Sequence, residues 1–300
     1  MRLIIIALAA VLLLAACTED NIKATDIVSE IPWPDQERAT YRVLDDDGEE
    51  VGTLQMSVDP EGDDAYLLRQ DYVFPGTEFT NNAAVVVGRA DLQPRNTTYV
   101  IDGPDGAASC SADYVGSDVT VVNVREDGER TDTLDVPHVA YDSWSDLFVW
   151  RTIDFSQGFE TEYADIVACQ APAPPQRLAV KLEVTGGETI DVPAGSFDTW
   201  RLEIDAGRDQ KAWFTTDDAH ILVRYDNGDQ IFELIEYSGN GSLTWGVAVG
   251  RGIGVALPPT SARHSTNITN AARIASTSQA TRTIPSLNAS LLAANSYNQS

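Results

Sequence analysis

The chain has 300 residues, and its 46 aspartates and glutamates outnumber its 20 lysines and arginines, giving a formal net charge of −26 at pH 7. A charge of this size and sign argues against binding to nucleic acid or to an anionic bilayer through a basic surface. Apolar residues make up 43% of the chain, which is close to the share in ordinary globular proteins.

The N-terminal residues have the pattern of an export signal. Arg2 precedes an apolar run, Leu3–Ala16, that is too short to span a membrane, which takes roughly 20 residues. A positive charge, an apolar run and small residues, in this order, predict a secretory signal peptide over residues 1–16. The stretch LAAC, residues 14–17, also resembles the bacterial lipobox, in which the cysteine receives a diacylglyceryl group. We therefore expect a lipid on Cys17 and a protein in the cell envelope, anchored on the extracytoplasmic face of a bacterial membrane.

Two cysteines, Cys110 and Cys169, remain once Cys17 is assigned to the lipid. An even remainder in an exported chain favours a disulfide between them, with two free buried thiols as the alternative. Neither cysteine belongs to a C-x-x-C pair and no histidine-rich segment is near, so the sequence indicates neither a metal site nor a cofactor.

Residues 17–38 are polar and contain IPWPDQ, which is typical of a tether, and a β domain is expected over 39–240. Three hairpins are predicted, over 39–58, 119–136 and 220–237. In the last two, Asp127-Gly128 and Asn227-Gly228 are expected to form tight turns in which both residues take positive φ.

Several further runs are rich in β-branched residues. They predict strands at Ala65–Val73, Ala83–Gly88, Thr97–Asp102, Arg177–Val184, Phe197–Ile204 and Lys211–Thr215. Many short strands at regular spacing predict a mainly β fold, built as a large curved antiparallel sheet in the form of an open barrel or a sandwich.

One stretch, DSWSDLFVWRTIDF (142–155), breaks the strand pattern. Its Trp144, Leu147 and Phe148 recur at near-helical spacing, behind Asp142 and Ser143 as candidate caps. We expect a single short helix here that plugs or lines the sheet.

The C-terminal residues 241–300 differ from the rest of the chain. They contain no aspartate or glutamate and four arginines, so residues 1–240 carry a net charge of −30. The segment shows no periodicity and is rich in Ser, Thr, Asn and Ala, which predicts a disordered low-complexity tail. A natural tail and the product of a frameshift are both compatible with this composition.

The motifs of the common enzyme classes are absent from the sequence, including the G-x-S-x-G, H-E-x-x-H, Walker and Rossmann patterns. A set of the Ser–His–Asp kind could be composed from His138, Asp142 and Ser143, or from His220 with Asp217 and Asp218. Any strongly acidic chain offers such sets by chance, so neither histidine is assigned a catalytic role.

Three pieces of the sequence resemble a bacterial envelope family catalogued as domain of unknown function 3108. The first is an aspartate before an apolar helix, followed by Arg151 and Gly158. The second is VPAGSFDTWRLEI (192–204), and the third is KAWFTTDDAHILVRY (211–225) with GDQIFELIEY (228–237). The resemblance implies an exported, mostly antiparallel β domain and supplies no catalytic residues.

These features predict a lipid-anchored extracytoplasmic β protein that is not an enzyme and that binds an apolar or envelope-derived ligand, such as a lipid, or a partner surface. No nucleic acid partner is expected, and the oligomeric state is left open. The candidate ligand-facing residues are Trp144, Phe148, Trp150, Trp200 and Trp213, with a role in filling the core as the alternative.

Two other functions compete with ligand binding. A cell-surface hydrolase would use an Asp/Glu pair, and its pocket would hold two carboxylates. A structural envelope subunit would need no pocket.

Overall fold

The computed structural model describes residues 22–77, 79–103, 106–170 and 173–239. The predicted signal peptide over 1–16, the candidate lipidation residue Cys17 and the predicted tail over 241–300 lie outside the described residues.

The described chain forms fifteen strands and one interrupted helical segment. The first eight strands are β1 (Glu37–Leu44), β2 (Glu50–Pro60), β3 (Ala65–Val73), β4 (Thr80–Gly88), β5 (Pro94–Asp102), β6 (Ala108–Val115), β7 (Asp118–Arg125) and β8 (Gly128–Asp135). The other seven are β9 (Tyr141–Asp142), β10 (Glu160–Val167), β11 (Gln176–Val192), β12 (Gly195–Asp205), β13 (Asp209–Thr215), β14 (Leu222–Asp226) and β15 (Ile231–Gly239). The helical segment consists of η1 (Ser143–Ser145), α1 (Asp146–Val149) and η2 (Trp150–Thr152).

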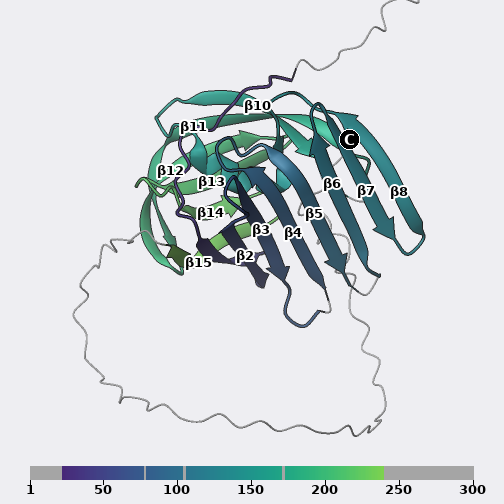
Figure 1. Cartoon of the computed structure of the whole chain (residues 1–300). Helices are drawn as coiled ribbons and strands as arrows, with labels where there is room; N and C mark the ends of the chain where they lie inside the picture. The colour runs from purple at the N-terminus through teal and green to yellow at the C-terminus, as the bar shows by residue number, and fades with distance from the viewer. Residues whose placement is uncertain (1–21, 78, 104–105, 171–172, 240–300) are drawn as a thin grey trace, which may run out of the picture.

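All fifteen strands belong to one sheet, in which β1 pairs with β15 and so joins a first half, β1–β8, to a second half, β9–β15. Every neighbouring pair is antiparallel except β9 and β10. The order ends at β8 and β9, so the sheet is open, but it curls strongly (Figure 1). Its curl brings β9 into contact with β5 of the other half. The predicted fold class, a large curved antiparallel sheet, is confirmed.

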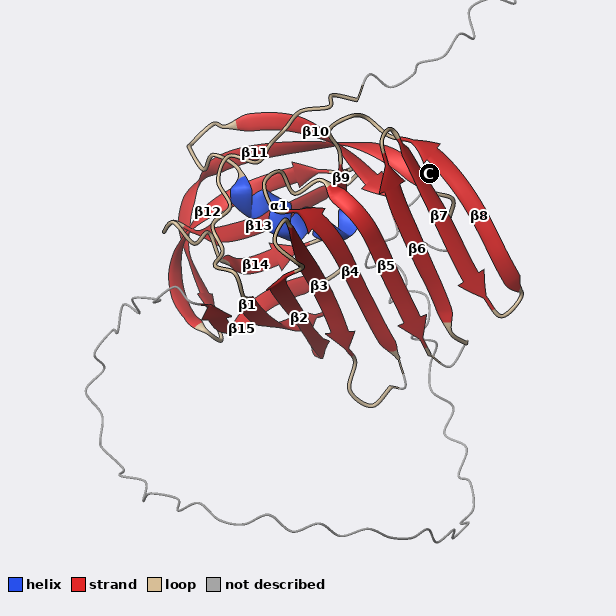
Figure 2. Ribbon diagram, in the orientation of Figure 1, coloured by secondary structure: helices blue, strands red, loops and turns tan. Residues whose placement is uncertain are grey.

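Alternation of the side chains gives the sheet a buried inner face. In β1, for example, Glu37, Ala39, Tyr41 and Val43 are buried and the residues between them are partly exposed. The helical segment lies within the curl, between the two halves of the sheet (Figure 2). Every residue from Trp144 to Thr152 is buried. A short helix that is enclosed on all sides has no solvated polar face, so its polar residues, such as Asp146 and Arg151, need partners inside the protein.

Strand positions agree closely with those expected, and β3 has the predicted bounds. The largest difference among them is β11, which continues beyond its predicted end at Val184 as far as Val192. The register with β12 shifts between Val184 and Gly186, where Gly186 has a φ of +144°. This bulge lets the strand continue through a pair of glycines that the sequence presents as a break.

The predicted turns need correction. The pair Arg125↔Gly128 places Glu126 and Asp127 at the tip of the hairpin, not Asp127-Gly128. Neither has positive φ, because Leu92 and His220 are the non-glycine residues with positive φ in the described chain. Asn227 does not have positive φ either. Its side-chain oxygen accepts hydrogen bonds from the amides of Asp229 and Gln230 and so closes a four-residue turn.

Part of the predicted tether belongs to the folded domain. Within residues 22–36, the side chains of Ile27 and Trp33 are buried. The amides of Ser29 and Glu30 donate to the carbonyl of Thr152, at 2.8 and 3.2 Å. The tryptophan supplies enough apolar area to hold this polar segment against the core.

Candidate functional site

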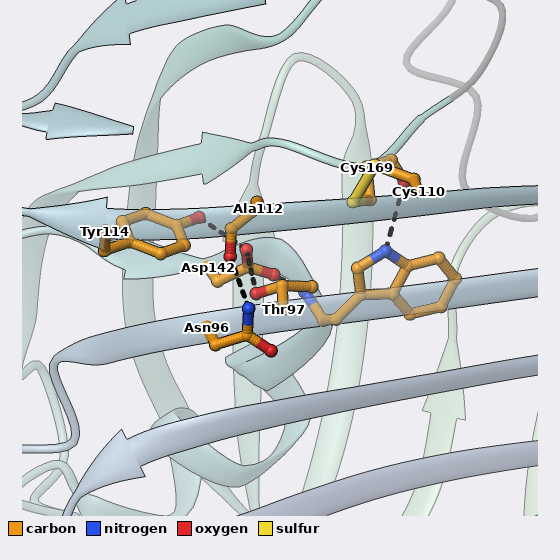
Figure 3. The surroundings of a disulfide bond; sticks show 8 residues. Asn96, Thr97, Cys110, Ala112, Tyr114, Asp142 and Cys169 are labelled. Carbon is orange, nitrogen blue, oxygen red and sulfur yellow. Dashed lines mark hydrogen bonds between the residues drawn. A yellow bond between two sulfur atoms is a disulfide. The ribbon is translucent and has the colours of Figure 1, made fainter. Parts of the chain in front are cut away.

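The helical segment is fixed at its start by Asp142. One carboxylate oxygen, Oδ1, accepts from the amide of Trp144 at 2.9 Å, as the predicted N-cap should. The other, Oδ2, accepts from the hydroxyls of Thr97 on β5, at 2.7 Å, and Tyr114 on β6, at 2.5 Å (Figure 3). Asp142 therefore ties the segment to the first half of the sheet. Burial raises the pKa of Asp142, and these hydrogen bonds oppose that shift.

Next to this contact, Cys110 on β6 forms a disulfide with Cys169, two residues after β10 (Figure 3). The disulfide expected from the cysteine count is therefore present. Both residues are buried, with their Cα atoms 5.6 Å apart. Trp144 donates from Nε1 to the carbonyl of Cys169 at 3.2 Å. The disulfide joins the two halves of the sheet beside the helical segment.

Two further aspartates lie in the same interior. Tyr163 on β10 donates its hydroxyl to Asp146 at 2.7 Å and accepts from Nε1 of Trp150 at 2.8 Å. Asp165, also on β10, is fully buried, and neither of its carboxylate oxygens has a hydrogen-bond partner in the described chain. Burial raises the pKa of both carboxyls well above the ordinary value, and their mutual repulsion adds to the shift of Asp165.

The end of the segment is held by a buried ion pair. Arg151 bonds both carboxylate oxygens of Glu37 on β1, and both side chains are 4% exposed. Arg151 also donates to the carbonyls of Ala219 and His220, at 2.8 and 2.9 Å. Tyr237 donates to Glu37 at 2.7 Å. This arrangement gives Arg151 a structural role at the contact between β1 and the helical segment.

The two histidines considered in the sequence do not form catalytic sets. His220 lies over the ring of Phe155, with its Nδ1 3.2 Å from the carbonyl oxygen of Arg151, and burial lowers its pKa. His138 is exposed and has no hydrogen bond to Asp142 or Ser143 among the described contacts.

A cavity of about 40 Å³ lies between the helical segment and strands of both halves. Its aromatic lining comprises Tyr72, Trp144, Trp150, Tyr225 and Phe232. The polar lining includes Gln70, Gln210 and Arg208, and Asp146 is its one acid. Gln70 is itself held in place, since it donates to the carbonyl of Trp144 at 2.7 Å.

Of the five predicted ligand-facing residues, two line the cavity and three do not. Trp144 and Trp150 line the cavity, whereas Phe148 packs edge-on against Trp33, with ring centroids 6.5 Å apart. Trp200 is partly buried against the core. Trp213 pairs across β12 and β13 with Arg201 and lies under the guanidinium of Arg224, so it is on the outer face of the sheet.

Sequence reasoning missed the strand residues of the cavity. Tyr72, Tyr225 and Phe232 occupy inward positions of β3, β14 and β15. The alternation of each strand indicates an inward side chain, but it does not indicate which distant strands share a cavity.

A second hollow lies on the outer face, across β10 to β13. Cross-strand pairing places Glu160 beside Glu183 and Glu183 beside Glu203. All three line the hollow, together with two lysines and no aromatic residue. In the described part of the chain, no three His, Cys, Asp or Glu side chains are placed to hold a metal ion. None of its helical pieces is long and apolar enough to cross a membrane.

A family model described as "Protein of unknown function (DUF3108)" matches residues 37–231. A comparison with curated proteins finds no match.

Three solved structures are similar to the chain. A β-barrel-like protein of domain of unknown function DUF1849 from Brucella abortus has 10% identity and a TM-score of 0.43, covering 70% of this chain and 99% of that one. A "putative lipoprotein" from Parabacteroides distasonis has 13% identity and a TM-score of 0.27, covering 71% and 100%. A "putative exported protein" from Bacteroides fragilis has 10% identity and a TM-score of 0.24, covering 70% and 99%. The low TM-scores of these matches carry no functional argument.

Proposed function

We propose that this chain, which belongs to the DUF3108 family of proteins of unknown function, is a lipid-anchored extracytoplasmic protein. It is not an enzyme. It binds an apolar ligand in the cavity beside its helical segment.

The lining of the cavity is the observation that carries this proposal. Five aromatic side chains surround it and Asp146 is the one acid among the lining residues. A glycosidase places two carboxyl groups on either side of the bond that it cleaves. An aromatic cavity with one carboxyl, which is already bonded to Tyr163, therefore favours binding over hydrolysis.

The size of the cavity sets a condition on the ligand. A volume of about 40 Å³ has room for a few water molecules and no more. A larger apolar molecule enters only if part of the lining moves. We expect Leu147 to be the lining residue that moves, because its apolar side chain lies between Asp142 and Arg151, the two points at which the segment is held.

Two observations support the extracytoplasmic site. The N-terminal residues have the order of a lipoprotein signal, ending in Cys17. The Cys110–Cys169 disulfide is of the kind that persists in oxidising compartments.

Native mass spectrometry of the full chain, extracted in mild detergent from its host membrane, tests the proposal. We expect a lipid-modified protein carrying an additional apolar mass. A protein that carries the lipid modification but no additional mass would overturn ligand binding and leave an assembly role. An unmodified Cys17 would overturn the anchor separately.

A pair of leucine variants tests the position of the site. Leu147→Ala enlarges the cavity, whereas Leu202→Ala removes a fully buried leucine that does not line it. With the fluorescent apolar probe N-phenylnaphthylamine, we expect Leu147→Ala to bind roughly tenfold more tightly, the effect of about one methylene in an apolar pocket. Leu202→Ala should bind as the unmodified protein does. Equal affinity of the two variants would place the probe elsewhere.

A further inference from the structure

Besides Glu37, which is paired with Arg151, three buried carboxyl groups lie close to the helical segment. Asp142 ends β9, Asp146 begins α1, and Asp165 lies on β10, which pairs with β9. Their exposed fractions are 0%, 4% and 0%. The three groups therefore lie at the contact between the helical segment and the last two strands of the sheet.

Among the three carboxyls, Asp165 is the one whose burial is not explained by a hydrogen bond or an ion pair in the described chain. It is two residues from Tyr163 on the same strand, so both side chains point to the same face, toward Asp146. In the described chain, neither oxygen of Asp165 has a hydrogen-bond partner and no cation forms an ion pair with any of the three carboxyls. A buried carboxylate in such surroundings is strongly disfavoured, whereas a neutral carboxyl is tolerated.

The groups around the pair leave it without compensating charge. The titratable groups that interact electrostatically with Asp146 or Asp165 are the carboxyl of Asp142 and the hydroxyls of Tyr114, Tyr163 and Tyr225. None of these groups carries a positive charge. The nearest cation of the cavity lining, Arg208, is paired with Asp229. Asp142 accepts three hydrogen bonds and Asp146 accepts one, whereas Asp165 accepts none of good geometry and only the neighbouring amide of Ile166 opposes the rise of its pKa.

We propose that protons bound by Asp146 and Asp165 hold the helical segment against β10, and that loss of these protons releases the segment and opens the cavity. The contact is coupled to the cavity because the hydroxyl of Tyr163 joins Asp146 to Trp150, and both of these residues line the cavity. Two ionised carboxylates at this contact repel each other and require water, which reaches them only if α1 moves away from β10. The species that binds at this site is the proton, so the opening does not require an apolar ligand in the cavity.

The sign of the pH dependence follows from linkage. Burial raises the pKa of both carboxyls in the folded state above the ordinary value of about 4. The folded state therefore holds more protons than the opened state, and closure is strongest below that ordinary value. As the pH rises toward the raised pKa, the equilibrium constant for closing then decreases by up to about tenfold per pH unit for each proton.

Hydrogen exchange of the full chain without ligand, corrected for the intrinsic pH dependence of exchange, measures this opening. We expect amides of residues 146–152 to lose protection as the pH rises above 5, while β12 and β13 keep theirs. Asp165→Asn, which is neutral at every pH, should flatten the dependence. Asp154→Asn is the matched control, because Asp154 follows the same segment but is exposed, and it should behave as the unmodified protein does.

A flat profile in the unmodified protein, or an equal slope in Asp165→Asn, would overturn the proposal. Asp146→Asn replaces Asp165→Asn if the latter does not fold. Infrared spectroscopy of the unmodified protein at pH 7 gives an independent reading, because solvent-exposed carboxyls are ionised there. The C=O band of protonated carboxyl groups should be present, and its absence would also overturn the proposal. None of these results depends on whether an apolar ligand binds.

Discussion

The guanidinium of Arg151 lies inside the curled sheet, where a lone charge would be costly. It is matched by Glu37, 114 residues away along the chain, and by the carbonyls of Ala219 and His220. Replacing a whole buried ion pair by apolar residues can be nearly neutral, whereas removing one partner leaves an uncompensated charge. The pair therefore specifies how β1 meets the end of the helical segment more than it adds stability.

Arg151→Met tests this at the scale of the residue. We expect it to lower the free energy of unfolding by about 3–5 kcal/mol, because the carboxylate of Glu37 remains buried without its counter-charge. The double variant Glu37→Gln with Arg151→Met should lose clearly less, since its amide is neutral. Urea unfolding followed by tryptophan fluorescence measures both. A double variant that loses as much stability as Arg151→Met alone would contradict the argument.

Among the strands, the sequence did not predict the two-residue β9 or the two longer strands β6 and β10. The sequences of β6 and β10, ASCSADYV and ETEYADIV, are rich in Ala, Ser, Asp and Glu, which are uncommon in strands. They nevertheless contain Cys110, Tyr114, Tyr163 and Asp165, four residues of the candidate site. Buried polar contacts replace the apolar pattern in these strands, so the signal used to find strands is weakest where the site lies.

Strands whose buried and exposed positions alternate regularly were predictable, as β3 shows even though one of its buried positions is Gln70. The helical segment was also predictable, including its cap at Asp142. What the sequence could not indicate is which strands share the cavity, because the pairing of β1 with β15 depends on contacts between residues about 200 apart. The disulfide between Cys110 and Cys169 could be predicted from the sequence, because only these two cysteines remain once Cys17 is assigned to the lipid.

The bulge in β11 gives a prediction for this element. Gly186 has a φ of +144°, and a Cβ atom placed there would meet no atom within 4 Å. Gly186→Ala should therefore lower the free energy of unfolding by about 1–3 kcal/mol through backbone strain, without a steric clash. Thr185→Ala, an exposed neighbour in the same bulge, should change it by less than about 0.5 kcal/mol. Thermal unfolding of both variants measures the difference, and equal stability would show that the strand relaxes.

An open sheet has to hold β9 and β10 against β5 and β6 without a backbone hydrogen-bond ladder between them. Here the enclosed helical segment contacts both halves through polar groups, and Asp142 alone reaches β5 and β6. The disulfide between Cys110 and Cys169 adds a covalent link across the same gap. The cavity thus lies at the place where the two halves are held together.

The double variant Cys110→Ser with Cys169→Ser tests the importance of that link. The two cysteines are 59 residues apart, and a loop of this length corresponds to about 4 kcal/mol in the chain-entropy description. We expect a loss of this size in urea unfolding, with the same loss in the reduced unmodified protein and no effect of reductant on the double variant.

Hydrogen exchange then separates a general from a local role of the disulfide. If the link mainly constrains the unfolded chain, protection should fall uniformly across the sheet. If it holds the halves together at the cavity, β6, β7 and the helical segment should lose more protection than β12 and β13. We expect the local pattern, because Trp144 donates to the carbonyl of Cys169 and so couples the segment to the link. A uniform loss would show that the core alone, without the disulfide, keeps the two halves closed.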